Sequence, residues 1–506
     1  MKYFKNIEKS ILALVLLMFL LVFSHGIRAN HLVGGELTWA CLGSGQYIFQ
    51  VKVYQDCNQS QPPPTSMQIK VWNNPNISII PLSNVGNNDF SFPCTEVSGG
   101  NPQYDCTTPG NGSVIEYILQ SAPVTLMGVP PGNGWHFTWD AFFRTGAAQN
   151  LDNAQNAGLT LHASMFSYNG LDASPCFDSS PTFIKPPLNV VCASENKVYN
   201  IGAFDSNLDS ISYEFANPLN NDFGTSFTPP SSPTEVAWAV GYDRTNQLPN
   251  LSQSSLNTGA SLNANTGALT FKSVTLGNFS TVIKVESWRC GQLIAVVYRE
   301  MLVNIVNCSG SNNSPNITLS GITGNAIVVN AGDIVSFDIL AQDNDLLANG
   351  TNQSVTLNIY GGEVGLGLAD PNLGCPYTPC ATASGGLPFS NLQTVNTTFN
   401  WETSCSLFTE DCYRPQKTFY FTILAQDDYC SLPGQNEVTV AITVNNQPAV
   451  ASPKLHCASV AANGAVTLDW EAPTNTNNSF QEYRIYASNN TNYSLIGTIN
   501  NINTTT

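Results

Sequence analysis

The sequence predicts an all-β protein made of tandem immunoglobulin-like or cadherin-like β-sandwich domains, the last of them incomplete. Three observations favour this fold class: many short runs alternate apolar and polar residues, 38 Gly and 30 Pro interrupt these runs, and no long amphipathic helix pattern occurs. Alternation with period two puts successive side chains on opposite faces of a strand. Short strands separated by turn residues are typical of sandwiches.

Residues 1–29 are a predicted signal peptide. Lys2, Lys5 and Lys9 precede the apolar run Ile11 to Phe23, and a short polar tail ends at Ala29. Thirteen apolar residues suit a signal peptide, whereas a membrane-spanning helix needs about 20, which leaves an uncleaved anchor as the weaker alternative. We expect cleavage after Ala29 and no transmembrane helix in the mature chain.

The charge of the chain limits its partners. The net charge is −17, and removing residues 1–29 takes away four basic and one acidic residue, which makes it −20. A surface this negative repels nucleic acid and anionic lipid, so we expect neither as a partner. Small cations are the partners that this charge favours.

The cysteines predict a disulfide framework. There are 14, an even number, and none lies in the signal segment. In an exported chain this indicates disulfides. We expect local pairs such as Cys94–Cys106 and Cys405–Cys430. Zinc is the alternative at Cys375 and Cys380, but no second Cys or His pair follows in register.

The first predicted domain covers residues 30–182. Two alternating runs joined by the turn Gly43-Ser44-Gly45 predict a hairpin, in which the inward positions are Leu37, Trp39, Cys41, Phe49, Val51 and Val53. Further along, Trp135, Phe137 and Trp139 fall on one face of a strand. We expect this stripe to be core rather than a ligand-binding platform, because sandwich cores need large inward residues.

The next two predicted domains are sandwiches at 183–308 and 309–446. Their boundaries follow the Pro-rich stretch 178–187 and the linkers SGSNNSP (309–315) and NNQPAVASP (445–453). The same alternation returns at Ile211–Phe215, Val335–Ile339, Phe419–Ile423 and Val438–Val444. The motif Phe337–Asp343 is echoed at Phe421–Asp427, and we interpret the echo as two strands of one domain.

The last segment, 447–506, resembles the first half of a fibronectin type III module, with Trp470 and Tyr483 as inward aromatics. Such sandwiches need roughly 100 residues. Only 54 remain from Pro453 onward, so we expect this domain to be incomplete.

Several motifs resemble large Bacteroidota surface proteins that carry a gliding-motility-associated C-terminal domain. The matching segments, spread over residues 30–446, are Asn30–Gly43, Tyr54–Cys57, Pro130–Trp135, Ser174–Pro181 and Leu262–Gly267. The resemblance implies type IX secretion, a location on the exterior of the outer membrane, and attachment there through a C-terminal domain missing from this sequence.

Carboxylate loops are the candidate metal sites. Asp205, Asn207 and Asp209 place three oxygen-bearing side chains at alternate positions before a strand, and Ca²⁺ takes six to eight oxygen ligands. The loop resembles the Asp-Pro-Asp-Gly-Asp loop of cadherin-like bacterial modules, with Ser206, Asn207 and Leu208 as departures. Shorter versions are Asp343, Asp345, Asp427 and Asp428. The alternative is that all are solvated turn residues.

No catalytic motif is evident. The histidines after the signal segment are His31, His136, His162 and His456; none lies in HExxH, and no GxSxG occurs. We expect His162 to be a sheet residue. Carboxylates are plentiful, but nothing in the sequence selects one pair as a glycosidase pair. We therefore expect no enzyme.

These observations favour a secreted, cell-surface structural or adhesive protein linked to gliding motility or surface attachment. Its expected partners are extracellular protein or glycan surfaces. Two alternatives stay open: a non-catalytic accessory part of a secreted hydrolase, and a glycan-binding protein.

Overall fold

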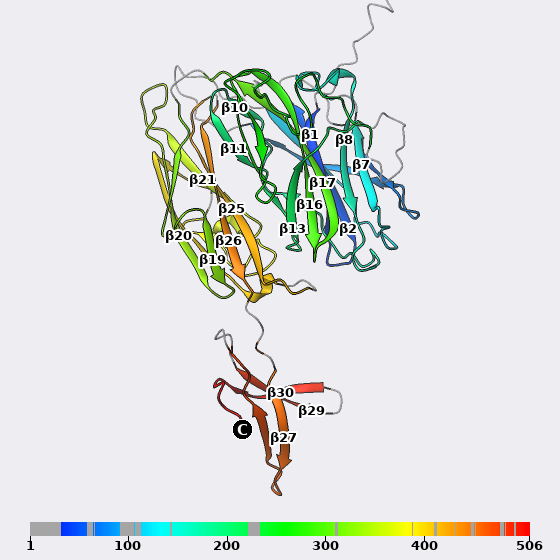
Figure 1. Ribbon diagram of the computed structural model, residues 1–506, viewed down its shortest axis with the longest axis vertical. Helices are drawn as coiled ribbons and strands as arrows, with labels where there is room; N and C mark the ends of the chain where they lie inside the picture. Colours follow the sequence, from blue (N-terminus) through cyan, green and yellow to red (C-terminus); the bar gives the residue numbers. More distant parts are fainter. Residues whose placement is uncertain are drawn as a thin grey trace, which may run out of the picture.

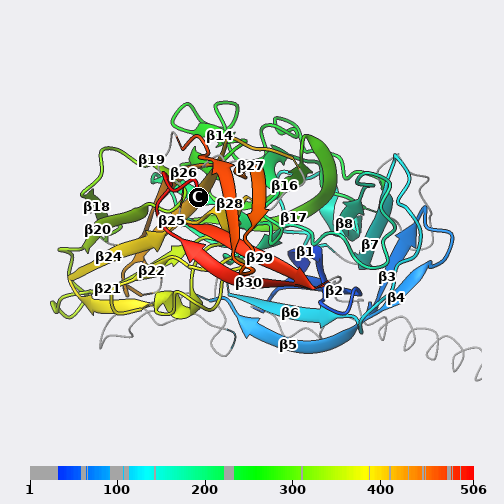
Figure 2. The ribbon, with the colours of Figure 1, turned by 90° about the horizontal axis from the view of Figure 1, so that it is seen from below.

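The computed structural model describes residues 32–57, 64, 66–91, 106, 113–141, 144–220, 233–308, 312–386, 388–408, 412–430, 432–446, 450, 452–475, 480, 482–489 and 492–506. These ranges contain thirty strands, three short 3-10 helices and no α-helix, which confirms the all-β prediction (Figures 1 and 2). The predicted signal peptide lies outside them. Within them, no helix has the length and apolar character needed to cross a membrane.

The first unit, residues 32–308, is built on a twelve-stranded sheet with the path β4-β3-β7-β8-β17-β1-β2-β6-β5 and the additional strands β10, β13 and β16. Its strands are β1 (Leu32–Cys41), β2 (Tyr47–Asp56), β3 (Gln68–Trp72), β4 (Ile79–Pro81), β5 (Ser83–Asp89), β6 (Val114–Gln120), β7 (Trp135–Ala141), β8 (Leu159–Met165), β10 (Val190–Cys192), β13 (Ser210–Phe215), β16 (Gly277–Arg289) and β17 (Gln292–Val306). Two smaller sheets contain β11 (Asn196–Asn200), β15 (Ala268–Lys272) and β14 (Thr258–Leu262), and β9 (Thr182–Phe183) with β12 (Ala203–Phe204); η1 is Ala154–Asn156.

The hairpin of β16 and β17 is the longest in the unit. Its two-residue turn is Cys290-Gly291, with φ of 53° and 78°, the conformation that matches the twist of tight hairpins. Along its other edge, β17 pairs in turn with β8, β1 and β10.

The expected boundary at 182/183 does not separate two cores. Strands from both sides of it share the sheet through β17, and one buried cluster runs from Leu32 to Ile305. The Pro-rich stretch 178–187 is a connection inside one unit. A break in composition marks where strands end, but it does not show which later strand they pair with.

The second unit, residues 312–446, is a sandwich of two sheets, β18-β20-β24-β22 and β19-β26-β25-β21-β23. The strands are β18 (Asn316–Ser320), β19 (Ala326–Asn330), β20 (Ile334–Gln342), β21 (Ser354–Tyr360), β22 (Thr382–Ala383), β23 (Phe389–Leu392), β24 (Thr394–Glu402), β25 (Gln416–Gln426) and β26 (Gln435–Asn445), with η2 (Leu366–Leu368) and η3 (Cys405–Leu407).

This sandwich is immunoglobulin-like or cadherin-like in its topology. The first two strands belong to opposite sheets, and β19 pairs with the last strand, β26, in parallel. The echoed motif lies on β20 and β25, one in each sheet. Between them, the Phe399 ring is 4.8 Å from Phe337 and 5.0 Å from Phe421, so the echo is two strands of one core, as predicted.

A third, smaller unit contains β27 (Lys454–Val460) paired with β28 (Val466–Glu471), and β29 (Tyr483–Asn489) paired with β30 (Asn492–Ile499). The rings of Trp470 and Tyr483 lie 5.3 Å apart in edge contact. Both are buried, as expected for inward aromatics.

Five disulfides are defined, and Cys430 is also disulfide-bonded. They are Cys41–Cys176, Cys57–Cys106, Cys192–Cys308, Cys290–Cys412 and Cys375–Cys380. The disulfide framework is confirmed, and the zinc alternative at Cys375 is replaced by a disulfide. Both guessed local pairs are wrong: Cys106 is bonded to Cys57, and Cys405 is a free, exposed thiol like Cys457. Sheet pairing brings distant cysteines together, so proximity in sequence was a poor guide.

Candidate functional site

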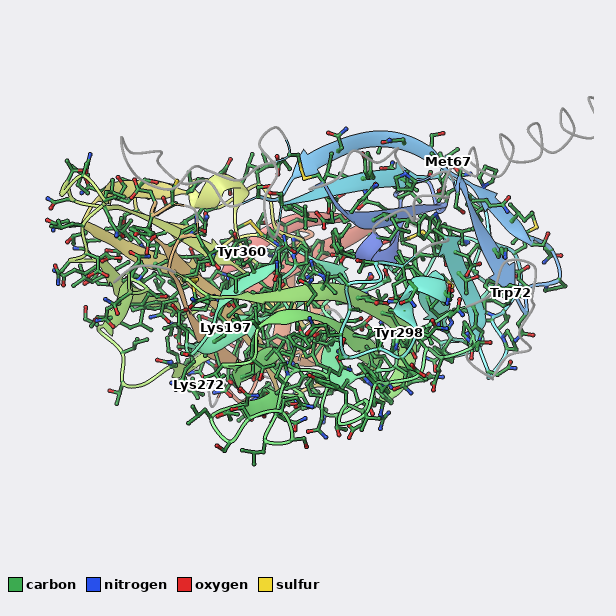
Figure 3. The ribbon with its side chains drawn as sticks, turned by 90° about the horizontal axis from the view of Figure 1, so that it is seen from above. Met67, Trp72, Lys197, Lys272, Tyr298 and Tyr360 are labelled. Atoms are coloured by element: carbon green, nitrogen blue, oxygen red, sulfur yellow. A yellow bond between two sulfur atoms is a disulfide. The ribbon has the colours of Figure 1, made fainter. Side chains whose placement is uncertain are left out.

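The first two units are joined by a covalent and polar seam. Cys290, at the tip of the β16–β17 hairpin, is bonded to Cys412 in the loop before β25. Lys185 of the first unit forms a buried ion pair with Glu437 on β26, and the Asn200 N–H donates to Glu437 Oε2 at 2.9 Å. Burial lowers the pKa of Lys185 to about 8, and Glu437 opposes that shift. Lys197, labelled near the seam in Figure 3, donates to Gln435 at 3.4 Å.

An apolar contact completes the docking. The Phe204 ring lies directly against Gly362: a Cβ on this glycine would be 1.7 Å from Phe204 Cδ2. Leu208 packs into the core of the second unit, and the Lys417 ammonium donates to the Leu208 carbonyl at 3.2 Å. Leu208 has φ of 60°, a left-handed conformation that is unfavourable for a leucine, so we infer that its burial across the seam stabilises the strained loop.

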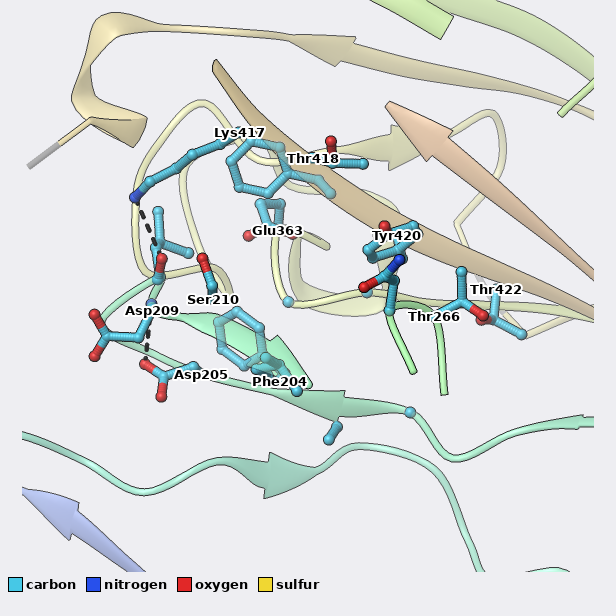
Figure 4. A pocket seen from close by; sticks show the side chains of 18 of the residues that line it. Phe204, Asp205, Asp209, Ser210, Thr266, Glu363, Lys417, Thr418, Tyr420 and Thr422 are labelled. Carbon is cyan, nitrogen blue, oxygen red and sulfur yellow. Dashed lines mark hydrogen bonds between the residues drawn. The ribbon is translucent and has the colours of Figure 1, made fainter. Parts of the chain in front are cut away.

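A cavity of about 310 Å³ lies in this seam (Figure 4). Its lining comes from the segment 200–213 of the first unit and from the 360–363 turn and strand β25 of the second. Glu363 is 4% exposed, and burial raises its pKa to about 7 against the attraction of Lys417. The seam therefore holds a hollow between the two units that is lined by polar and aromatic side chains.

The predicted calcium loop borders this cavity, and its carboxylates already have partners. Asp205 Oδ1 accepts the Asn207 N–H at 2.8 Å, and Asp205 Oδ2 accepts the Ser287 hydroxyl at 2.7 Å. Asn207 Oδ1 accepts the Ser179 N–H at 2.9 Å. The buried Asp209 binds Arg289 through both oxygens, at 2.8 and 2.6 Å.

The Arg289 guanidinium supplies the positive charge here. It also contacts Asp178 at 2.7 Å. Burial disfavours the charge of Arg289, but Asp209 and Asp178 raise its pKa above the usual value. Burial and the negative charge of Asp209 raise the pKa of Asp205 to about 7. Burial and the negative charge of Asp205 likewise raise the pKa of Asp178. The sequence analysis did not identify Arg289 as the partner of these carboxylates. A basic residue at the end of a largely apolar strand, in a chain with few basic residues, could have indicated a buried ion pair.

The shorter loops meet at one end of the second unit. Asp345 Oδ2 accepts the Asn313 N–H at 2.6 Å, and Asp427 Oδ2 accepts from Asn312 Nδ2 at 3.0 Å. Asp428 Oδ1 accepts the Ser354 N–H at 2.8 Å. Burial raises the pKa of Asp343 and, to about 7, that of Asp427.

Among the described residues, no group of three or more His, Cys, Asp or Glu side chains has the geometry of a metal site. Asp205, Asp343 and Asp427 each accept a hydrogen bond from the backbone N–H two residues further on, as Asp residues in turns do, but all three are buried. Calcium binding stays a prediction, to be decided by titration.

One further polar cluster was not foreseen. On β7 and β8, His136 Nδ1 lies 3.0 Å from His162 Nε2, and the Ser164 hydroxyl lies 2.9 Å from the former. Burial lowers the pKa of His136, and burial with His136 nearby lowers that of His162 to about 3. All three side chains are buried in the sheet, so the cluster has the character of a structural network and not of an accessible Ser–His site.

No family model matches the chain, and no curated protein matches it. Similar solved structures include protocadherin gamma B2 extracellular cadherin domains 1–5, with 10% identity, 83% of this chain and 69% of that chain covered, and a TM-score of 0.18. Domains 1–6 of the surface layer protein SbsC are 10% identical, with 93% of this chain and 62% of that chain covered, and a TM-score of 0.15. Zebrafish RET cadherin-like domains 1 to 4 are 10% identical, with 78% and 79% covered and a TM-score of 0.13.

This chain spans less than two thirds of the surface layer structure. Likeness at these TM-scores does not define a shared fold or function. The class of protein is instead indicated by the strands and disulfides of the chain itself. Structural disulfides persist in oxidising compartments, so this is an all-β protein of the secreted or cell-surface class.

Proposed function

We propose that this chain is a structural and adhesive component of a bacterial cell surface, and that it holds and presents binding surfaces away from the cell. The observation that carries the proposal is the clamped pair of β units. One disulfide, one buried ion pair and the Phe204–Gly362 contact join two β units of different architecture.

The disulfide that links the two units is suited to an extracellular protein. The Cys290–Cys412 bridge spans 122 residues of sequence, and closing a loop of that length stabilises the folded state by about 5 kcal/mol in the chain-entropy model. Domains joined in one chain usually move relative to each other. A covalent and polar link between consecutive units limits that motion, so a surface protein can hold its binding surfaces at a fixed distance from the cell.

The finer assignment rests on the opening motif. Asn30–Gly43 and Tyr54–Cys57 resemble Bacteroidota surface proteins, and this supports type IX secretion, a place on the exterior of the outer membrane, and a part in gliding or attachment. The accessory part of a secreted hydrolase is the competing function.

The test is deletion of the gene in the bacterium that encodes it, with attachment to glass and to other cells measured under flow. We expect attachment to fall and to return with the wild-type gene. A Cys290→Ser/Cys412→Ser gene should restore less at the same secreted level. Unchanged attachment and spreading, together with no binding of the purified protein to cells, glycans or surfaces, would discard adhesion; hydrolytic turnover by the native product would favour the competitor.

A further inference from the structure

The seam between the two units holds two hollows that meet. The cavity of about 310 Å³ and an adjoining open groove of about 510 Å³ share Ser210 and Arg414 in their linings. The groove runs past the Cys290–Cys412 disulfide. Arg414 lines both hollows and donates to the Ser210 hydroxyl and, at 3.2 Å, to the Trp288 carbonyl. The cavity alone is within the range of ligand pockets, roughly 300–1,000 Å³.

Aromatic rings and neutral polar groups line the inner cavity. The rings include Phe204, Tyr213, Tyr360 and Tyr420, and Asn265 and Thr266 lie beside them. Aromatic side chains offer a flat apolar face, while amides and hydroxyls offer both donors and acceptors. This combination matches a ligand that has apolar C–H faces and a rim of hydroxyl groups.

Several charged groups around the cavity already have partners within the protein. Asp209 is paired with Arg289, and the Lys417 ammonium donates to the Leu208 carbonyl. Glu363 has a pKa of about 7 because it is buried, so near neutrality much of it is a neutral carboxyl that donates as well as accepts. The lining therefore favours a neutral ligand over an ion.

The mouth of the groove adds two more rings. Trp288 is half-buried and fixed by its indole N–H, which donates to Ser212 Oγ at 3.2 Å. Tyr413 is 71% exposed. These two rings lie on the solvent side of the cavity. They offer a further stacking surface for the part of a ligand that does not fit inside the cavity.

The strand arrangement speaks against an extended peptide. Strand β25, which forms one wall, lies between β21 and β26 and pairs with both. Without a free edge on this strand, a peptide has no ladder to join here. The net charge of −17 disfavours anionic polymers.

We propose that this seam is a carbohydrate-binding site, which takes one sugar unit in the inner cavity and carries the rest of a neutral glycan across Trp288 and Tyr413. The inference rests on the proposed adhesive function, since it names neutral glycan as the surface that is bound.

The experiment is saturation-transfer NMR on the whole purified protein with free glucose, galactose, mannose, N-acetylglucosamine and cellobiose as probes. We expect at least one sugar to receive saturation and to bind at least tenfold more weakly to Tyr420→Ala. Thr418→Trp puts a large ring at an exposed strand position on the cavity wall and should abolish binding. Thr318→Trp is the matched control at an exposed strand position elsewhere and should bind as wild type does.

Thermal melts identify any variant that fails to fold. If Tyr420→Ala fails to fold, Thr418→Trp still tests the site. No saturation of any probe would overturn the site, and so would binding that Thr418→Trp leaves unchanged. Binding of tetramethylammonium or of a neutral peptide in place of the sugars would overturn the ligand class. If attachment still depends on the gene while no sugar binds, the seam inference fails and the adhesive function stands.

Discussion

Lys185 of the first unit is paired with Glu437 of the second, and both side chains are buried. Glu437 also accepts the Asn200 N–H, so a single carboxylate from the second unit satisfies two donors of the first. A buried charge that loses its partner is strongly destabilising. This pair therefore makes the folding of each unit sensitive to the presence of the other.

The first prediction concerns that pair. Glu437→Gln should lower the free energy of unfolding by about 3 kcal/mol, because the Lys185 ammonium stays buried without a counter-charge. Urea denaturation measures the change. Glu402→Gln, at an exposed position on β24, is the control and should stay within about 0.5 kcal/mol of wild type. Equal stability of the two variants would show that the ion pair contributes little.

The second prediction concerns the bridging disulfide. Cys290→Ser/Cys412→Ser should lower stability by about 5 kcal/mol, whereas Cys375→Ser/Cys380→Ser should lower it by about 2 kcal/mol, because its loop is short. The sequence separations are 122 and 5. Calorimetry of each variant compares them. The same loss from both would mean that loop closure does not set the contribution of these bridges.

The third prediction concerns the packing of Phe204. Gly362→Ala should reduce stability by about 1–3 kcal/mol, because the added methyl group overlaps the Phe204 ring. Phe204→Leu should recover part of that loss in the double variant. Gly132→Ala, where an added Cβ meets nothing within 4 Å, is the control. Additive losses in the double variant would contradict the contact.

The fourth prediction concerns pH. Burial lowers the folded-state pKa of His162 to about 3, so between pH 6.5 and 3 this residue binds more protons in the unfolded chain than in the folded one. Stability from this group is complete above pH 6.5 and falls as pH drops through that window, by up to about 1.4 kcal/mol per pH unit. Asp205, Glu363 and Asp427 have raised pKa values and act in the opposite direction.

The difference between wild type and His162→Phe isolates the histidine. Between pH 6.5 and 4, the free energy of unfolding of the His162→Phe variant should fall less than that of wild type. Denaturation at each pH measures it. Parallel pH profiles for the two proteins would refute the assignment.

The fifth prediction concerns calcium. One buried oxygen of Asp343 has no hydrogen-bond partner among the described residues, and Asp427 lies close enough to interact with it electrostatically. Millimolar Ca²⁺ should raise the melting temperature, and Asp343→Asn should remove the rise. Asp209→Asn should not remove it, because Arg289 already neutralises Asp209. A melting temperature that is equal in calcium and in chelator would end the calcium prediction.

Local pattern predicted much of this structure. Trp135, Phe137 and Trp139 are fully buried, as period-two alternation indicated, and the Phe337 and Phe421 motifs face one core. Long-range pairing was out of reach: β17 joins strands from both sides of residue 182, and Cys57 is bonded to Cys106. Asp205 and Asp209 were found as neighbours, but their partner Arg289 comes from a strand some 80 residues away. The seam was missed because nothing local specifies which surfaces of two units dock.

The pairing of β1 with β17 has a consequence for biosynthesis. Gly35 lies opposite Glu300, so the first strand among the described residues waits for the last strand of its unit before the sheet can close. Contacts this distant in sequence make folding slow. Until β17 (Gln292–Val306) has been synthesised, the leading strand has no finished sheet to enter, so the unit cannot close on its N-terminal strands alone.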